Sequence, residues 1–486
     1  MIKDFPNFKS NLEILLLTIL FIIFVTPYSF RIGQEGVSGN YLFILFPIFY
    51  YIVNFWNRSE VHAREIIRPS KSVLFFMLTL FVIFFTALYD HHENLHFSFR
   101  RIASFIAFMS IFTLMFVKID NNMLWAFKYA IVIFTLYSSI DTLIQYINFG
   151  GAELGTYAKG KVGTNRIGFV YVIALWITYF FNSKTLLISI LKHLVVSIII
   201  IGLLLTFSRS SMIALFSSII VYFFVTILIY LREKKSYGKL LKKLLLSIAY
   251  IVGMSIVLGN LFPNTVSESN RMIFDYISPV QKSLSVKAEA SIDELNELTT
   301  NSTSKSIEDK TTKKLNELTT NSSSKNIEDN NFIESIFDLS NANLPKALID
   351  LSNKTSSIGY RYYVMKKVID FVGQNPFNGS GFLGVWIVLE KVDGQYKGSA
   401  HGQFVDVLFR LGLIGFFIYL FFTYKILLYL FKQDIGLFIG FFGILVYGLF
   451  HETFKLSQGA FIFAFLFAMY DQKKILLGQV KSHFKK

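Results

Sequence analysis

The segment LLLTFSRSSMIALF, residues 203–216, decides how this chain folds. It lies within an apolar run from Leu194 to Leu231 in which Arg209 is the only charged residue. A continuous helix over that run would be roughly 57 Å long, nearly twice the hydrocarbon thickness of a bilayer. The sequence therefore predicts two membrane-spanning helices, at 186–207 and 211–231, that reverse direction at a tight turn carrying Arg209.

Apolar runs of similar length recur along most of the 486 residues, of which 53% are hydrophobic. About 20 apolar residues form a helix long enough to cross a bilayer. This pattern predicts an all-α polytopic membrane protein with about 12 transmembrane helices. The predicted spans are residues 12–30, 39–56, 72–89, 101–117, 123–147, 167–182, 186–207, 211–231, 244–262, 403–429, 436–451 and 458–470.

The net charge of +15 follows the predicted topology and does not indicate a nucleic-acid partner. With the N-terminus in the cytoplasm, the cytoplasmic segments hold 20 Lys and Arg residues and the short outer loops hold 8. Such an excess of basic residues is typical of the cytoplasmic side. We therefore expect both termini in the cytoplasm and the long polar segment 263–402 outside it. The absence of cysteine excludes disulfides and thiolate metal sites.

Four regions follow from this topology. They are the membrane domain with spans one to nine (1–262), an extracytoplasmic loop (263–402), spans ten to twelve (403–470) and a basic cytoplasmic tail (471–486). Within the loop, LNELTTNSTSKSIEDK is followed by the near copy LNELTTNSSSKNIEDN, which together occupy 295–330. Two polar copies are too few to stack as a solenoid, so we expect a solvated helical or disordered insertion.

The end of the loop carries an amphipathic helix, predicted at residues 359–373 within GYRYYVMKKVIDFVGQNP. Gly373 and Pro376 are typical of a helix end. Arg361 projects from the centre of the apolar face, so the guanidinium either points inward or reaches water at a frayed helix start. The predicted apolar face consists of Met365, Val368, Ile369 and Val372.

The segment KGSAHGQFVDVLFRLGLIGFF, residues 397–417, joins the loop to span ten. His401 precedes the helix and is expected at the outer membrane surface, as a cap or surface residue or as a catalytic group. Asp406 and Arg410 are four residues apart on one helix face, which favours a structural ion pair between them.

The predicted topology places Arg209, Arg361 and His401 on the outer side near the bilayer surface. Arginine presents a planar fork of donors that matches phosphate oxygens and keeps its charge. Histidine can take a proton from a hydroxyl group near neutral pH. These side chains suit a sugar linked to a polyprenyl pyrophosphate, whose tail lies in the lipid and whose phosphates lie at the surface.

The motifs around these residues resemble those of the O-antigen ligase and polymerase-like membrane glycosyltransferases of bacterial cell surfaces. The long outer loop before span ten also fits this family. The resemblance rests on TFSRSS at 206–211, Arg361 followed by NPFNGSGFLG at 375–384, and His401 followed by LGLIG at 411–415, with weaker similarity in KVGTNRIGFV at 161–170.

The resemblance implies a membrane-embedded, GT-C-like glycosyltransferase of the bacterial cytoplasmic membrane, which takes its donor glycan from undecaprenyl pyrophosphate. It implies that Arg209 and Arg361 hold the pyrophosphate and that His401 acts on the acceptor hydroxyl. Arg166 and Arg410 are further candidates for substrate binding. The expected partners are membrane lipid and other membrane proteins of polysaccharide assembly.

No cofactor and no metal are expected. The short outer loops are poor in carboxylates, and fixed guanidinium groups can neutralise the leaving group instead. The segment DHHENLH at 90–96 clusters three histidines on an outer loop, but its spacing matches no metal motif.

The first interpretation is a polymerase of lipid-linked repeat units for O-antigen, capsule or exopolysaccharide. A ligase that moves finished glycan to a lipid acceptor is the alternative within the same family. A flippase or exporter of lipid-linked oligosaccharide is an alternative of another class, which predicts charges along a path across the membrane. A sensor or scaffold is a further alternative, against which Arg361 on an apolar face argues.

Overall fold

The structure is a computed structural model that describes thirteen segments of the chain. These are residues 8–25, 29–32, 35–38, 69–90, 95–149, 167–183, 185–206, 208–232, 357–389, 391–392, 395–396, 402–453 and 457–483. The predicted spans at 39–56 and 244–262 and the tandem repeat at 295–330 lie outside them. The chain divides into two compact units. The larger unit consists of Met1–Ser269 together with Val364–Lys486, and the smaller unit is Asn270–Tyr363. Of the smaller unit, the structure describes residues 357–363.

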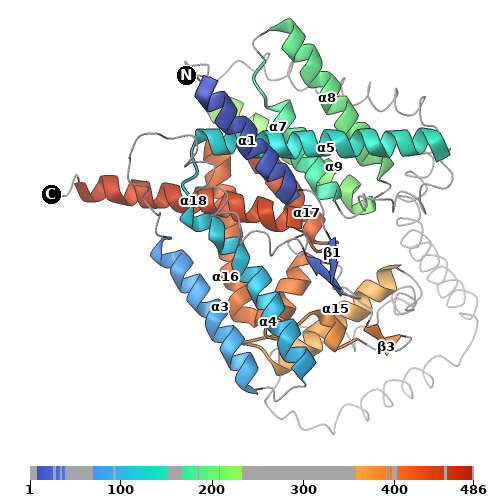
Figure 1. The fold of residues 1–486 in the computed structure, drawn as a ribbon, viewed down its shortest axis with the longest axis vertical. Coiled ribbons are helices and arrows are strands. Elements are labelled where there is room, and N and C mark those ends of the chain that lie inside the picture. The colour runs from blue at the N-terminus through green and yellow to red at the C-terminus, as the bar shows by residue number, and fades with distance from the viewer. Residues whose placement is uncertain are drawn as a thin grey trace, which may run out of the picture. The chain divides into compact units, whose positions relative to one another are not determined.

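Helices dominate the described residues, and they coincide with ten of the twelve predicted spans (Figure 1). Six are long and apolar enough to cross a membrane, namely Lys71–Tyr89, Ser98–Phe116, Asn121–Ile147, Leu186–Leu205, Ser210–Leu231 and Gln403–Gln433. The helices are α1 (Phe8–Val25), α3 (Lys71–Asp90), α4 (Leu95–Met109) with the 3-10 segment η2 (Ser110–Phe116), α5 (Asn121–Phe149), α7 (Gly168–Tyr179), α8 (Leu186–Leu205), α9 (Arg209–Arg232), α15 (Ser357–Gln374), α16 (Gln403–Gln433), α17 (Ile435–Gly448) and α18 (Ser457–His483).

Two short antiparallel hairpins accompany the helices of the predicted all-α fold. Strand β1 (Ser29–Ile32) pairs with β2 (Glu35–Ser38), and β3 (Lys391–Val392) pairs with β4 (Gln395–Tyr396). The β3–β4 hairpin lies in the predicted loop, whereas β1 includes the last two residues of the span predicted at 12–30, because α1 ends at Val25. Local backbone pairing in the hairpins satisfies N–H and C=O groups without changing the helical framework.

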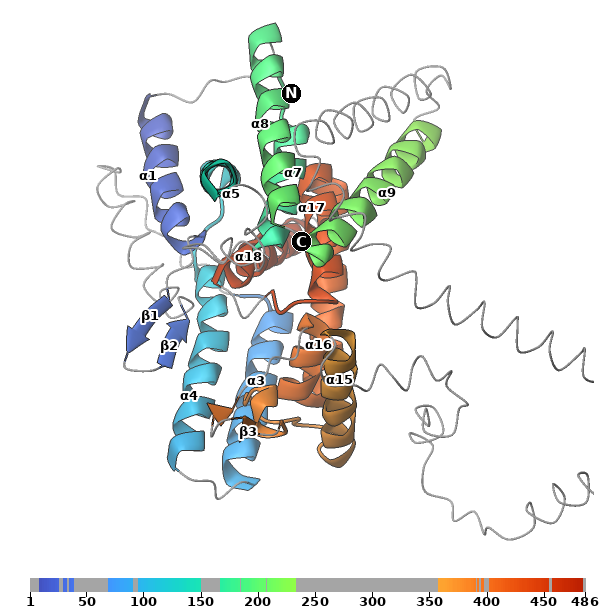
Figure 2. The ribbon, with the colours of Figure 1, turned by 90° about the vertical axis from the view of Figure 1, so that its right-hand side faces the viewer.

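Helix α7 is enclosed by protein on all sides. Every residue from Gly168 to Thr178 is buried, and α7 packs against α5, α8, α9 and α17. Its 12 residues extend for roughly 18 Å, which is too short to cross a bilayer alone. The predicted span at 167–182 is therefore a short internal helix. Figure 2 shows α1 and α8 on either side of α5, which is seen end on.

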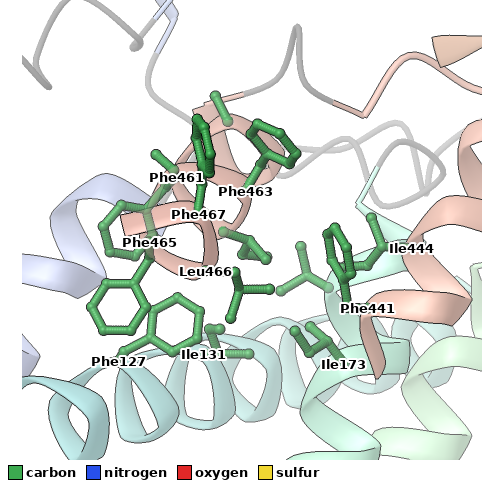
Figure 3. Close-up of a cluster of buried hydrophobic side chains, with 14 of the residues drawn as sticks. Phe127, Ile131, Ile173, Phe441, Ile444, Phe461, Phe463, Phe465, Leu466 and Phe467 are labelled. Atoms are coloured by element: carbon green, nitrogen blue, oxygen red, sulfur yellow. The ribbon is translucent and has the colours of Figure 1, made fainter. Parts of the chain in front are cut away.

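The core is built from aromatic side chains of helices that are far apart in the sequence. Phe127 of α5 stacks on Phe465 of α18 with ring centroids 4.0 Å apart and planes 3° apart. Ile173 of α7 and Phe441 of α17 complete the same cluster, shown in Figure 3. This packing joins α5, α7, α17 and α18 within the larger unit.

Helix α18 extends far beyond the predicted span at 458–470. It continues to His483 and so includes most of the predicted tail at 471–486. Asp471 accepts a hydrogen bond from the Ser70 backbone N–H at 2.9 Å. Gln472 accepts one from the Ile119 N–H at 2.8 Å. These polar side chains lie one turn past the apolar run, and their bonds extend the packed helix into the region that was predicted as a tail.

Helix α16 is not the single straight span predicted at 403–429. Gly412 has φ 62° and ψ −168°, a backbone conformation that only glycine adopts readily. The rings of Phe404 and Tyr419 are 6.2 Å apart, whereas a straight helix would separate residues 15 positions apart by roughly 22 Å. The helix therefore folds back sharply at Gly412.

The glycine-rich loop NPFNGSGFLG bonds the backbone groups that the kink frees. Ser380 N–H donates to the Phe409 carbonyl at 2.7 Å, and Phe382 N–H donates to the Arg410 carbonyl at 3.1 Å. Leu413 N–H donates to the Pro376 carbonyl at 2.7 Å. The two sequence motifs at 375–384 and 411–415 thus form one interlocked unit.

Replacing Gly412 by alanine is expected to destabilise the protein by more than ~2 kcal/mol, because the strained φ adds to a clash with the Phe377 carbonyl. A methyl group on Gly412 would lie 2.5 Å from that oxygen, whereas one on Gly373 meets nothing within 4 Å. Gly373→Ala is the matched control, which we expect to be neutral or stabilising by about 0.5–1 kcal/mol. Thermal unfolding in detergent measures both, and an equal Tm for the two variants would contradict the kink.

Candidate functional site

The turn between α8 and α9 lies where the hydropathy pattern predicts it. Thr206 Oγ1 donates to the Leu203 carbonyl at 2.7 Å and accepts from the Ser208 N–H at 3.3 Å. Ser208 Oγ accepts from the Ser211 N–H at 3.4 Å, so Ser208 caps α9. Arg209 is the first residue of α9, and its side chain lies outside the described residues.

The start of α7 lies against the start of α9. A methyl group placed on Gly168 would lie 1.8 Å from Ser211 Oγ and 3.3 Å from the Tyr447 ring. The rings of Phe169 and Tyr447 are 5.6 Å apart. Ser211 is fully buried. The amino ends of two helices and the end of α17 therefore meet at one point.

The start of α16 reaches the same region. Thr453 Oγ1 donates to Gln403 Oε1 at 3.4 Å. A methyl group on Gly402 would lie 3.1 Å from the Leu449 carbonyl oxygen. Gly448 is equally close to Gln403, because a methyl group there would lie 3.2 Å from the Gln403 Cβ. Residues 447–453, called the α17–α18 turn below, thus contact the amino ends of α7 and α16.

These contacts bring together chain segments that flank three predicted site residues. Arg166 precedes the start of α7, Arg209 begins α9, and His401 precedes Gly402. Arg166 and His401 lie outside the described residues, so the distances among the functional groups stay predictions. The amino end of a helix carries a partial positive charge and free N–H groups, so the meeting of three such ends favours an anion.

Arg361 lies in α15, and its side chain is half-buried. The predicted apolar face is correct in Val368 and Val372, which are buried, but wrong in Met365, which is 49% exposed. Val364 takes its place as a fully buried residue. Arg361 is one turn before Val364 and seven residues before Val368, so it shares the helix face of the buried valines.

Arg410 forms the predicted ion pair with Asp406. Its Nε donates to Asp406 Oδ2 at 2.8 Å, and its Nη1 donates to the Phe382 carbonyl at 2.7 Å. The negative charge of Glu452 also acts on Arg410. The guanidinium thus joins the first half of α16 to the glycine-rich loop, and its role in binding substrate remains a prediction.

The sequence analysis missed His451 and Glu452, which stand on the α17–α18 turn. The His451 ring stacks on the Tyr447 ring with centroids 5.0 Å apart and planes 26° apart. His451 is the last residue of the span predicted at 436–451 and Glu452 follows it, on the predicted outer side, the same side as Arg209. Their position at the outer end of a predicted span is the sequence feature that could have identified them as candidates.

Among the described residues, no group of three His, Asp or Glu side chains is placed to hold a metal ion. The side chains of the three histidines in the segment 90–96 lie outside the described residues.

Replacing Gly168 by alanine is expected to destabilise the protein by about 1–3 kcal/mol, because the new methyl group overlaps Ser211 Oγ. A second change, Ser211→Gly, removes the overlapping atoms and should restore most of the loss, whereas Ser211→Ala should restore less. Thermal unfolding of the single and double variants gives the coupling energy. Additive effects of Gly168→Ala and Ser211→Gly would show that α7 and α9 do not touch there.

Comparison with known protein families gives one match, between residues 194–420 and the family model described as O-Antigen ligase. The match contains Arg209, Arg361, His401 and Arg410. Comparison with curated protein sequences gives no match. Members of the matched family are glycosyltransferase-like ligases and polymerases that handle lipid-linked glycans in membranes. Residues 194–420 therefore match the O-antigen ligase family model, which confirms the resemblance predicted from the motifs.

Proposed function

We propose that this chain is a membrane glycosyltransferase that polymerises lipid-linked oligosaccharide repeat units. It transfers glycan from undecaprenyl pyrophosphate to a sugar hydroxyl at the outer face of the cytoplasmic membrane. The observation that carries this proposal is the meeting of the segments next to Arg166, Arg209 and His401 at the α17–α18 turn. These segments are far apart in the sequence, and the residues that they carry suit one reaction.

The donor side of the site is positively charged. Arg209 and Arg361 hold the pyrophosphate, and the amino ends of α7 and α9 add their N–H groups and partial charges. Arg166, just before α7, contributes a third guanidinium. Negative charge develops on the leaving pyrophosphate as its bond to the sugar breaks, and fixed positive groups stabilise that charge without reorganising.

The acceptor hydroxyl is activated by His401. The hydroxyl oxygen attacks the anomeric carbon, the bond from that carbon to the pyrophosphate oxygen breaks, and the hydroxyl proton passes to the imidazole. Undecaprenyl pyrophosphate leaves with the bonding electron pair. Arg410, bound to Asp406 and the Phe382 carbonyl, fixes the helix that follows His401.

A ligase is the second candidate, and the description of the matched family favours it. A ligase uses the same donor and differs in its acceptor, which is a membrane lipid in place of another lipid-linked repeat unit. The flippase alternative is less well supported. Among the described residues, the ion pair Arg410–Asp406 lies in the first half of α16 and the pair Lys128–Asp434 lies at its end, and the two do not form a continuous charged path.

Replacing Arg209, Arg361 or His401 by alanine should lower glycan transfer by about 10²–10³-fold, because each variant loses leaving-group stabilisation or proton transfer. The measurement uses the purified chain in lipid nanodiscs, with lipid-linked repeat units extracted from producing cells, and follows product length on gels. His193→Asn is the matched control, since this histidine is in the first half of α8, away from the site. Unchanged transfer in all three alanine variants would remove the enzymatic assignment.

Deleting the chain from producing cells separates the two candidate functions. Loss of a polymerase should leave single repeat units attached to the final acceptor, because joining of units stops while attachment continues. Loss of a ligase should leave polymer on undecaprenyl pyrophosphate. Mass spectrometry of surface glycan and of the lipid-linked pool reads both outcomes, and we expect the first.

A further inference from the structure

The α17–α18 turn contacts the starts of α7 and α16, and the start of α7 in turn contacts the start of α9. Tyr447 lies against Gly168 at the start of α7, and Gly168 lies against Ser211 in the first turn of α9. Leu449 and Thr453 contact Gly402 and Gln403 at the start of α16. The turn therefore lies next to the segments that carry the predicted site residues.

His451 and Glu452 are the two consecutive residues of this turn whose side chains carry an imidazole and a carboxylate, and both groups can accept hydrogen bonds from a sugar. We propose that they form the acceptor side of the site, where they bind and orient the sugar that supplies the attacking hydroxyl. The inference rests on the proposed function, and it assigns the acceptor to residues that neither the motifs nor the family match includes.

Charge favours Glu452 for the acceptor side. Asp406 pairs with Arg410 at 2.8 Å, and the negative charge of Glu452 also acts on this guanidinium. A pyrophosphate brought to this carboxylate would be repelled. A neutral sugar has hydroxyl groups that donate hydrogen bonds, and an ionised carboxylate only accepts them. Glu452 thus discriminates against the donor phosphates and in favour of the acceptor sugar.

The structure also holds His451 in a defined orientation. Its ring stacks on Tyr447, and its backbone N–H donates to the Tyr447 carbonyl at 3.1 Å. Tyr447 is in turn fixed by Phe169 of α7. An imidazole fixed in this way can accept a hydrogen bond from a sugar hydroxyl group without losing much conformational freedom.

The division of roles leaves the reaction balanced. The attacking hydroxyl loses its proton to His401, the new glycosidic bond forms at the anomeric carbon, and the bond to pyrophosphate breaks. His451 and Glu452 bind neighbouring hydroxyl groups of the acceptor and take no net proton. Their loss should therefore weaken acceptor binding and alignment while donor binding is preserved.

The variants that test this assignment are His451→Asn and Glu452→Gln, which keep side-chain size close to the original. Each should lower the rate of transfer between extracted lipid-linked repeat units at least about tenfold. Affinity for the probe undecaprenyl pyrophosphate, measured on the same nanodiscs, should change less than about twofold, because these residues do not touch phosphate. Arg209→Ala should lose that affinity, and His193→Asn should change neither quantity.

Three outcomes overturn the inference. Normal transfer in both variants removes their role in the reaction. A parallel loss of undecaprenyl pyrophosphate affinity places them on the donor side, and a fall in Tm together with that loss shows a structural role only. Failure of the proposed function looks different, because then the unmodified chain shows no transfer or Arg209→Ala transfers normally.

Discussion

Backbone hydrogen bonding at Gly412 is the constraint on which the site depends. In a membrane, a freed carbonyl or N–H group must find a protein partner, since lipid offers none. The loop at 375–384 supplies partners for the Phe409 and Arg410 carbonyls and for the Leu413 N–H. Because these bonds are made, α16 can fold back and bring Gly402 to the α17–α18 turn. A straight α16 would carry the segment with His401 away from α7 and α9.

One guanidinium joins the segment before this kink to the glycine-rich loop. Arg410 binds Asp406 within the first half of α16 and the Phe382 carbonyl of the loop, and the negative charge of Glu452 on the α17–α18 turn also acts on it. A half-buried charge is costly unless it is paired and hydrogen-bonded. The two bonds that satisfy Arg410 therefore hold the start of α16 and the loop together, and this favours a positioning role over direct contact with phosphate.

Local rules could predict some of this arrangement. The break before Arg209 follows from helix length and bilayer thickness, and the Asp406–Arg410 pair follows from helical spacing. The predicted buried face of α15 included Met365, which is exposed, in place of Val364, which is buried. The apolar stripe of this helix is short, so neighbouring choices of the buried face fit the sequence equally well. The kink could not be predicted, because LGLIG is apolar and reads as an ordinary span until the loop packs against it. His451 and Glu452 were missed because the turn that carries them contacts α7 and α16, which are far away in the sequence.

The extent of the family match fits a separation of donor and acceptor sides. In the proposed function, a ligase and a polymerase use the same lipid-linked donor and differ in the acceptor. The matched region ends at residue 420, so it contains the α8–α9 turn, α15, the glycine-rich loop and the kink of α16. The α17–α18 turn lies beyond it. If that turn holds the acceptor, the segment that distinguishes one acceptor from another is free to differ between family members while the donor-binding segments keep a common pattern.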